Sequence, residues 1–209
     1  MIDVKKAYNM WAEQYDTNNN KTRDLEAKAL RKVLSAISFN SCLEIGCGTG
    51  KNTVWLVEKA QKVLAVDLSV EMLVKAKEKV SSNKVQFTQA NILSEWTFRT
   101  ALYDLVTFSL VLEHVENLDP IFEEVSQALV PGGHVYIGEL HPFKQYAGSK
   151  ARFDTEDGTQ VVESFNHHMS DFTNAAKRHG LAVADIDEYF DNNDRNELPR
   201  ILTILLKKV

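Results

Sequence analysis

The sequence predicts an α/β domain with a doubly wound sheet of seven strands, mostly parallel and covered by helices on both faces. Between residues 25 and 140, short apolar runs alternate with amphipathic segments of helical length. This alternation is typical of parallel strands joined by right-handed helical crossovers. Two β-type runs, Leu181–Tyr189 and Ile201–Lys208, then follow each other with only a polar loop between them. Strands joined without a helix pair antiparallel, so we expect an antiparallel C-terminal strand at the sheet edge.

The order of the predicted elements follows from hydrophobic spacing and from helix-capping residues. An aromatic-rich helix is expected over 2–16 and an amphipathic helix over 25–37. Ser69 is a suitable N-cap for a helix that reaches Lys79. Strands are expected where apolar residues run together or alternate, at 41–45, 62–66, 85–88, 103–110 and 134–140. The remaining helices are expected over 51–59, over 119–129 with a stop at Pro131-Gly132-Gly133, and over 168–179.

Length and composition fit one globular domain spanning residues 1–209. The chain contains 44% hydrophobic and 25% charged residues and has no internal repeat or low-complexity tract. Its net charge is −5 and no cluster of lysine or arginine stands out, which argues against a nucleic-acid partner. No apolar run is long enough for a membrane span and no signal peptide is evident, so we expect a cytoplasmic protein. The composition leaves the choice between a monomer and a homodimer open.

A glycine-rich turn follows the first predicted strand, with the sequence Leu43-Glu44-Ile45-Gly46-Cys47-Gly48-Thr49-Gly50. Glycines allow the backbone to turn tightly and let a ligand approach where a Cβ would otherwise stand. The spacing G-x-G-x-G differs from the dinucleotide fingerprint G-x-G-x-x-G, whose third glycine would fall on Lys51. It also differs from a phosphate-binding P-loop, because Gly50-Lys51 is followed by Asn52.

An acidic residue, Asp67, ends the second predicted strand roughly twenty residues after the glycines. A carboxylate at this place can accept hydrogen bonds from both hydroxyls of a ribose. Taken alone, the glycines fit a structural turn and Asp67 fits a surface acid. Together in one β-α-β unit, they favour a nucleoside-binding site.

Several short motifs resemble those of the class I S-adenosylmethionine-dependent methyltransferases. Glu44-x-Gly46-x-Gly48-x-Gly50 resembles motif I of that family, and Val66-Asp67-Leu68-Ser69 resembles the next motif. Three further stretches of this sequence resemble the family's motifs around strands four and five, namely Tyr103-Asp104-Leu105-Val106, Leu112-Glu113-His114-Val115 and Leu129-Val130-Pro131-Gly132-Gly133. This resemblance implies a Rossmann-like fold with an antiparallel seventh strand, and S-adenosyl-L-methionine as cofactor. Residues 1–25 resemble the N-terminal cap segment of small-molecule members related to quinone-biosynthesis methyltransferases.

The resemblance also implies roles for individual residues around the cofactor. The glycine loop would border its methionine part and ribose, and Asp67 would hold the ribose hydroxyls. Asn91 stands where the family often has an aspartate beside the adenine, and its carbonyl oxygen can still accept a hydrogen bond. Tyr15 would cover the sulfonium, because a cation is attracted to an aromatic face. The implied cofactor-binding residues are Tyr15, Glu44, Gly46, Cys47, Gly48, Gly50, Asp67, Leu68, Met72, Asn91, Ile92, Ser109 and Leu110.

Two histidines, His141 and His114, are candidate catalytic bases. They follow the fifth and fourth predicted strands, and ligands of such sheets bind at the carboxyl ends of the strands. In the family, a histidine at the place of His114 often has a structural role instead. Residues 140–167 form a long insertion that we expect to act as a substrate lid, with a hairpin turn at Asp157-Gly158. No spacing of histidines with cysteines or acids indicates a metal site.

The acceptor is expected to be a small molecule. The Asn/Asp-Pro-Pro-Tyr/Phe motif of nucleic-acid amino-methylating enzymes is absent after the fourth strand, where Ser109-Leu110-Val111-Leu112 stands instead. Two alternatives remain open at this point. One is a non-catalytic module that binds S-adenosylmethionine or S-adenosylhomocysteine, and the other is an NAD-dependent oxidoreductase.

Overall fold

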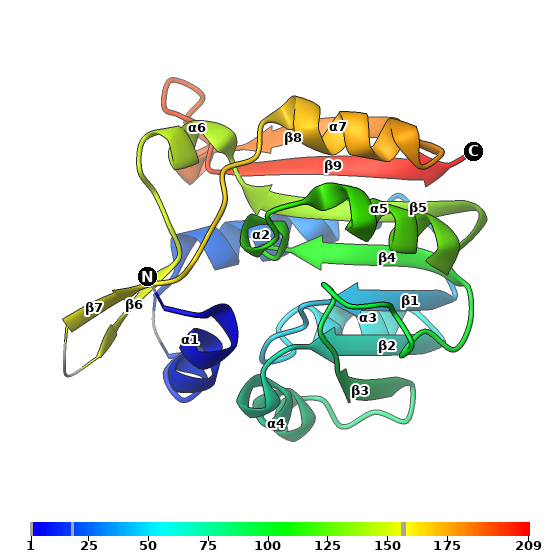
Figure 1. The fold of residues 1–209 in the computed structure, drawn as a ribbon, viewed down its shortest axis with the longest axis horizontal. Coiled ribbons are helices and arrows are strands. Elements are labelled where there is room, and N and C mark those ends of the chain that lie inside the picture. Colours follow the sequence, from blue (N-terminus) through cyan, green and yellow to red (C-terminus); the bar gives the residue numbers. More distant parts are fainter. Residues whose placement is uncertain (1, 18, 156–157) are drawn as a thin grey trace.

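A seven-stranded sheet in the order β3-β2-β1-β4-β5-β9-β8 forms the centre of the computed structural model (Figure 1). The structure describes residues 2–17, 19–155 and 158–209. The strands are β1 (Ser41–Ile45), β2 (Lys62–Asp67), β3 (Val85–Gln89), β4 (Tyr103–Ser109), β5 (Leu129–Leu140), β8 (Leu181–Tyr189) and β9 (Ile201–Lys208). The first five pair parallel, whereas β9 pairs antiparallel with both β5 and β8. The structure therefore confirms the predicted fold class.

Helices cover both faces of this sheet (Figure 1). Helices α5 (Leu118–Ala128) and α7 (Met169–Arg178) lie on one face, where they share a core with Leu43, Ile45 and other strand residues. Helices α2 (Lys21–Leu34) and α3 (Thr53–Lys59) lie on the other face, with Cys42 in their core. Helix α4 (Val70–Lys79) packs along β2 and β3. Alternate residues of β1 thus enter opposite cores, as in a parallel sheet that is buried on both faces.

Some boundaries differ from the predicted ones for local reasons. Helix α2 begins at Lys21 rather than Leu25, because the side chain of Asn20 caps it by accepting a hydrogen bond from the backbone of Arg23 at 3.0 Å. Strand β5 begins at Leu129, immediately after α5, and therefore includes the Pro-Gly-Gly run that was expected to lie outside it. Gly132 has a φ of +76°, which allows the irregular start of this strand.

The N-terminal segment and the insertion after β5 pack against each other beside the carboxyl ends of the central strands. Helix α1 (Val4–Trp11) lies beside the strand pair β6 (Arg152–Thr155) and β7 (Gly158–Val161). Along the chain, the short helix α6 (Pro142–Tyr146) lies between β5 and β6. Trp11 stacks on Phe153 with ring centroids 5.0 Å apart, and Ile2 pairs with Val162. Asp157 of the expected hairpin turn lies outside the described residues. The cap and the insertion therefore form one small apolar cluster.

None of the helices in the described residues has the length and apolarity needed to cross a membrane. Likewise, that part of the chain brings together no group of three or more histidine, cysteine, aspartate or glutamate side chains fit for a metal ion.

Two buried carboxyl groups, Glu26 and Glu44, join the helices of one face to the sheet. Burial raises the pKa of Glu44 to about 8, against the effect of the Thr53 hydroxyl that donates to it at 2.6 Å. Burial also raises the pKa of Glu26 to about 7, although Asn52 and Tyr136 donate to it at 3.0 and 3.1 Å. Both groups therefore hold a proton in the folded protein at pH values where they would be ionised in the unfolded chain.

The raised pKa of Glu44 predicts that stability falls as the pH rises. Between the unfolded pKa of about 4.3 and the folded value, the native state binds the extra proton, so each such group lowers the free energy of unfolding by about 1.4 kcal/mol per pH unit. Glu44→Gln removes one such group, and its unfolding free energy should decline less steeply between pH 5 and about 8 than that of the parent. Urea unfolding across this range measures the slope. The exposed Glu58→Gln is the matched control, and equal slopes for Glu44→Gln and the parent would contradict the prediction.

Candidate active site

A cavity of about 540 Å³ lies at the carboxyl ends of β1, β2 and β4. Its size is that of a pocket for one or two small ligands. One side is formed by the glycine loop and the other by α1 together with residues near His114. The sequence-predicted residues that line it are Tyr15, Gly46, Gly48, Asp67, Leu68, Asn91, Ile92, Ser109, Leu110 and His114.

The glycine loop follows from a sharp bend at the end of β1. The backbone N–H groups of Gly46 and Cys47 both donate to the carbonyl oxygen of Val66, at 2.8 and 3.0 Å. Gly46 has a φ of +69°, and a Cβ placed on it would come within 2.3 Å of Val111 Cγ2. Only glycine fits at this position, because both the dihedral angle and the close approach exclude a side chain. The loop thereby leaves open space above β1.

Asp67 is held in a fixed orientation at the tip of β2. One carboxylate oxygen accepts from the backbone N–H of Gly48 and the other from that of Ser69, each at 2.8 Å. Burial raises the pKa of Asp67, and these backbone hydrogen bonds only partly counteract it. A carboxylate oxygen can accept more than one hydrogen bond, so the group can still bind ligand hydroxyls. The glycine loop and Asp67 therefore fit the ribose of a nucleoside.

The turn after β3 forms the far wall of the cavity. The side chain of Asn91 accepts a hydrogen bond from the backbone of Leu93 at 3.0 Å, which closes the turn on itself. The carbonyl oxygen of Ile92 accepts from the indole of Trp96 at 3.0 Å. The turn that would border an adenine is thus fixed by its own hydrogen bonds and by a buried tryptophan.

The turn after β4 is held by Glu139, a residue that the sequence analysis missed. One oxygen of this buried carboxyl group accepts from the backbone N–H groups of Val111 and Leu112, at 2.9 and 2.8 Å. Burial, together with the nearby Glu113, raises the pKa of Glu139 to about 8. Leu110, with a φ of +58°, donates its backbone N–H to Gly138. An acid inside an otherwise apolar strand was the signal that could have identified Glu139.

His114 lies in a chain of hydrogen bonds that reaches the cavity. Its Nδ1 lies 2.7 Å from the carbonyl oxygen of Glu163, and its Nε2 lies 2.9 Å from the hydroxyl of Tyr8. A carbonyl oxygen can only accept, so Nδ1 carries the proton and Nε2 accepts from Tyr8 in the neutral ring. Burial raises the pKa of Tyr8, and the nearby Tyr15, Glu113 and Asp67 raise it further, so the phenol keeps its proton.

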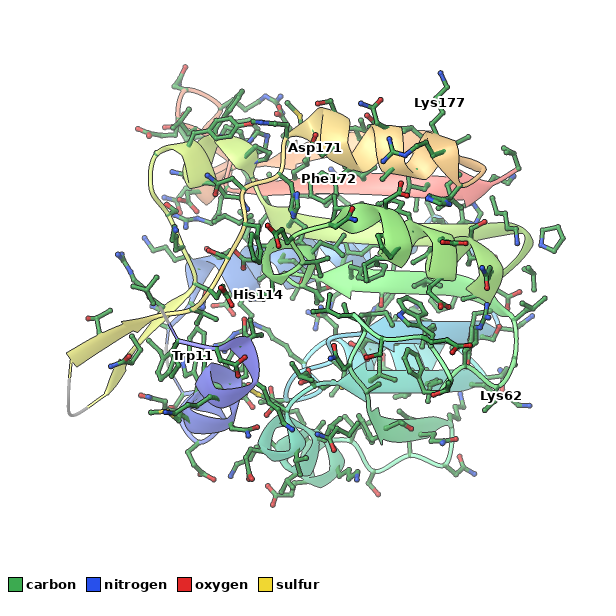
Figure 2. The ribbon with its side chains drawn as sticks, in the orientation of Figure 1. Trp11, Lys62, His114, Asp171, Phe172 and Lys177 are labelled. Atoms are coloured by element: carbon green, nitrogen blue, oxygen red, sulfur yellow. The ribbon has the colours of Figure 1, made fainter. Side chains whose placement is uncertain are left out.

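Aromatic rings of the N-terminal cap close the cavity above His114. Tyr8 stacks on Trp11 with ring centroids 5.8 Å apart and meets the His114 ring edge-on at 5.5 Å. Figure 2 shows Trp11 and His114 at the end of the molecule where α1 lies. Tyr15 lines the cavity, and the guanidinium of Arg23 lies 4.5 Å from its ring centroid. Burial raises the pKa of Tyr15 to about 12.

Four of the predicted cofactor-binding residues do not line the cavity. Glu44 is buried beneath the loop and accepts a hydrogen bond from Thr53. The Cys47 side chain belongs to the core under α2 and α3 that also contains Cys42. Met72 is fully buried in the small cluster under α1. A Cβ on Gly50 would contact α4, at 3.2 Å from Val80. These four residues therefore pack against the core or α4 and not against the cavity.

The position of His141 does not support the catalytic role predicted for it. Its ring is fully buried and does not line the cavity. Nδ1 accepts from the backbone N–H of Phe143 at 3.1 Å and so caps α6, while Nε2 bonds to Glu188 at 2.9 Å. His167 likewise donates to the carbonyl oxygen of Val115 at 2.7 Å. Both rings therefore have structural roles, and of the two predicted bases only His114 reaches the cavity.

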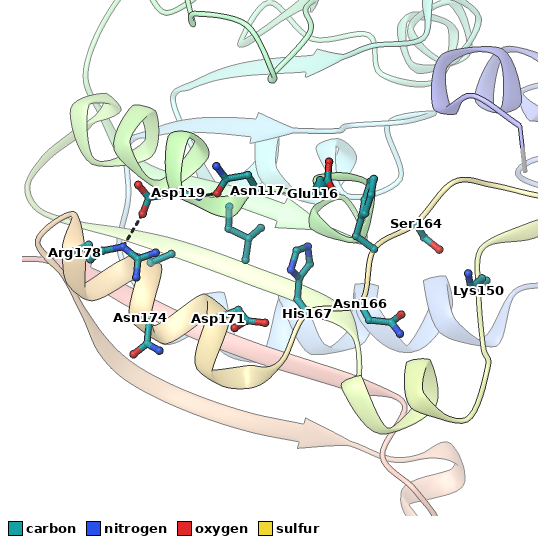
Figure 3. Close-up of a pocket in the computed structure, with 13 residues that line it drawn as sticks. Glu116, Asn117, Asp119, Lys150, Ser164, Asn166, His167, Asp171, Asn174 and Arg178 are labelled. Carbon is teal, nitrogen blue, oxygen red and sulfur yellow. Dashed lines mark hydrogen bonds and ion pairs between the residues drawn. The ribbon is translucent and has the colours of Figure 1, made fainter.

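A second pocket of about 620 Å³ lies between α5, α7 and residues 164–167 (Figure 3). It shares Glu116, Asn117 and Phe165 with the first cavity. The side chains in view are mostly polar, and His167 points into the pocket from the segment before α7.

Comparisons with known proteins agree with this geometry. Residues 43–137 match the family model described as a methyltransferase domain. The chain is 27% identical to an uncharacterized methyltransferase, AN0656, of Emericella nidulans, a match that covers 89% of this chain and 78% of that protein. It is 31% identical to malonyl-[acyl-carrier protein] O-methyltransferase of Priestia megaterium, but this match covers 70% of the chain and only 57% of the relative.

Solved structures show the same fold. The complex of DhpI with SAH has a TM-score of 0.77 at 24% identity, and the match covers 97% of this chain and 94% of that one. An S-adenosylmethionine-dependent methyltransferase from Mesorhizobium loti has a TM-score of 0.70 at 23% identity, covering 89% of this chain and all of that one. Family model and relatives agree with the methyltransferase resemblance that the motifs indicated, and the solved structures share the fold. Residues 43–137 thus match a methyltransferase domain, and the chain resembles the class I S-adenosylmethionine-dependent methyltransferases in its motifs and its fold.

Proposed function

We propose that the chain transfers a methyl group from S-adenosylmethionine to a small organic acceptor, and that His114 takes the proton which the acceptor loses. One observation carries this proposal: a single cavity joins the glycine loop and Asp67 to His114 and Tyr8. A donor site and a proton-accepting group therefore face the same space.

The donor half of the cavity fits the S-adenosyl group. The open space at Gly48 gives room for the ribose and methionine part, and Asp67 offers carboxylate oxygens to the ribose hydroxyls. Leu68, Asn91 and Ile92 would border the adenine, while Ser109, Leu110 and Tyr15 would border the methionine end. When bound, S-adenosylmethionine supplies a methyl group on a positively charged sulfur, which leaves with the bonding electrons.

The acceptor half offers a base that is already oriented. Because Nδ1 of His114 donates to the Glu163 carbonyl, the lone pair of Nε2 accepts from the Tyr8 hydroxyl, and in this proposal an O–H group of the acceptor takes the place of that hydroxyl. Nε2 would then take the proton that the acceptor loses when it is methylated. The carboxyl of Glu113 lies 3.9 Å from this nitrogen, and burial raises the pKa of that carboxyl while the neighbouring His114 partly offsets the rise.

A small acceptor agrees with the surface and with the relatives. The net charge of −5 gives no support for a nucleic-acid substrate. Relatives include a malonyl-[acyl-carrier protein] O-methyltransferase and a ubiquinone biosynthesis O-methyltransferase of Nitrosomonas europaea. In this proposal residues 1–209 act as one domain, with 1–25 as a cap and 140–167 as a substrate lid. We also propose a cytoplasmic location, which the free thiols of Cys42 and Cys47 support.

Asp67→Ala should weaken donor binding. Losing hydrogen bonds to a charged group costs about 1.5–3 kcal/mol, which corresponds to roughly a ten- to hundredfold rise in the Kd of S-adenosylhomocysteine. Titration calorimetry measures this Kd, and circular dichroism checks that the variant is folded. Asp185→Ala, at an exposed position of β8, should leave the Kd unchanged. Equal affinity for Asp67→Ala and the parent would refute the assignment of the donor site.

His114→Gln should slow methyl transfer without loss of donor affinity. A positioned general base contributes about 10²- to 10⁴-fold to the rate, so kcat should fall by that order for an acceptor that must lose a proton. The assay follows the labelled methyl group of S-adenosylmethionine into a panel of phenols, carboxylic acids and amines. His134→Gln, in the middle of β5 and outside the cavity, serves as control and should retain its rate. A His114→Gln variant at the full parental rate would remove the base from the proposal.

A further inference from the structure

The pocket between α5 and α7, which we call the outer groove, adjoins the active-site cavity. The turn at Glu116 and Asn117 and the ring of Phe165 line both spaces, so they form the boundary between them. The backbone N–H of Phe165 donates to the carbonyl oxygen of Glu113 at 2.7 Å, and Nε2 of His167 donates to the carbonyl oxygen of Val115 at 2.7 Å. These bonds fix the lid segment over the β4–α5 turn beside His114.

The two spaces differ in chemistry. The active-site cavity has apolar walls such as Ile45, Val66 and Ile92, interrupted by a few polar groups. The outer groove instead presents the carboxamides of Asn117, Asn166 and Asn174, and Figure 3 shows them on different sides of it. A molecule that extends through both would therefore be apolar at one end and polar at the other.

The charges of the outer groove largely cancel each other. Asp119 accepts from Arg178 at 2.7 Å and lies 3.1 Å from His179. Asp171 caps the start of α7, where it accepts from the backbone N–H of His168 at 2.7 Å. Lys150 and Glu116 are exposed and of opposite sign. The lining thus carries three acids and two bases, an excess of one negative charge, which does not favour a phosphate.

The carboxamide groups that line the outer groove are available to bind a ligand. Asn117 uses its side-chain oxygen to cap α5, and its side-chain NH₂ group is left to donate. The side chains of Asn166 and Asn174 are exposed and have no hydrogen-bond partner within the described ranges. Each carboxamide both donates and accepts hydrogen bonds. Their natural counterparts are uncharged groups that do the same, namely hydroxyls and amides.

We propose that the outer groove is a binding subsite for the distal part of an elongated acceptor, a neutral part that carries hydroxyl or amide groups, while the methylated end lies at His114. This inference rests on the proposed function, whose acceptor class it specifies. The size of the groove, about 620 Å³, exceeds what a single methyl-accepting group would need.

Nuclear magnetic resonance of the full chain saturated with S-adenosylhomocysteine tests the subsite. Methyl β-D-glucoside supplies hydroxyls, panthenol supplies an amide with hydroxyls, and glucose 6-phosphate and spermidine are the charged probes. At least one neutral probe should shift the side-chain amide signals of Asn166 and Asn174, and the response to each shows whether sugar-like or amide-bearing tails are preferred. The charged probes should shift these signals less. No shift with either neutral probe, or a larger shift with a charged one, would overturn the proposal.

Variants separate this subsite from the donor site. The double variant Asn166→Leu, Asn174→Leu should raise the Kd of the responding neutral probe at least tenfold, followed through the backbone signals of α7. Asn83→Leu, an exposed asparagine before β3, should leave that Kd unchanged. Both variants should bind S-adenosylhomocysteine as the parent does. If the donor analogue itself fails to bind the parent chain, the proposed function fails, whereas intact donor binding without a probe response removes only the subsite.

Discussion

The carbonyl oxygen of Val66 and the carboxylate of Asp67 are the constraint on which the site depends. The first accepts two backbone N–H groups from the bend after β1, and the second accepts a third from Gly48. Neighbouring parallel strands bring these groups together, because Ile45 pairs with Val66 in the sheet register. A glycine-rich loop is thereby fixed by the strand beside it, and the ligand space exists before any ligand arrives.

The parts of the fold that local sequence determines could be predicted. Strand β1, its glycine loop, Asp67 and the Ser69 cap depend on residues close to each other in the chain, and the structure has them where the patterns indicated. The antiparallel pairing of β8 and β9 followed in the same way, since no α-helix separates them. The start of β5 was missed, because a Pro-Gly-Gly run normally ends a helix and tertiary pairing with β4 overrode that preference.

The acceptor half of the site could not be derived so fully. Tyr8 and His114 are 106 residues apart, and their contact depends on how the cap folds back over the sheet. His141 occupies the same kind of sequence position as His114, after a central strand, and yet its ring is turned inward to cap α6. Spacing along the chain identifies the strand end but not the direction of a side chain, which depends on the packing of distant segments.

The position of β9 between β5 and β8 bears on the order in which the molecule can assemble during synthesis. Strand β8 leaves the ribosome before β9, but its only partner in the sheet is β9. Until that partner is made, β8 has no neighbour for its backbone hydrogen bonds, and the open edge of β5 is also unpaired. Late closure of this edge leaves a growing chain with exposed strands, a state in which nascent proteins depend on chaperones.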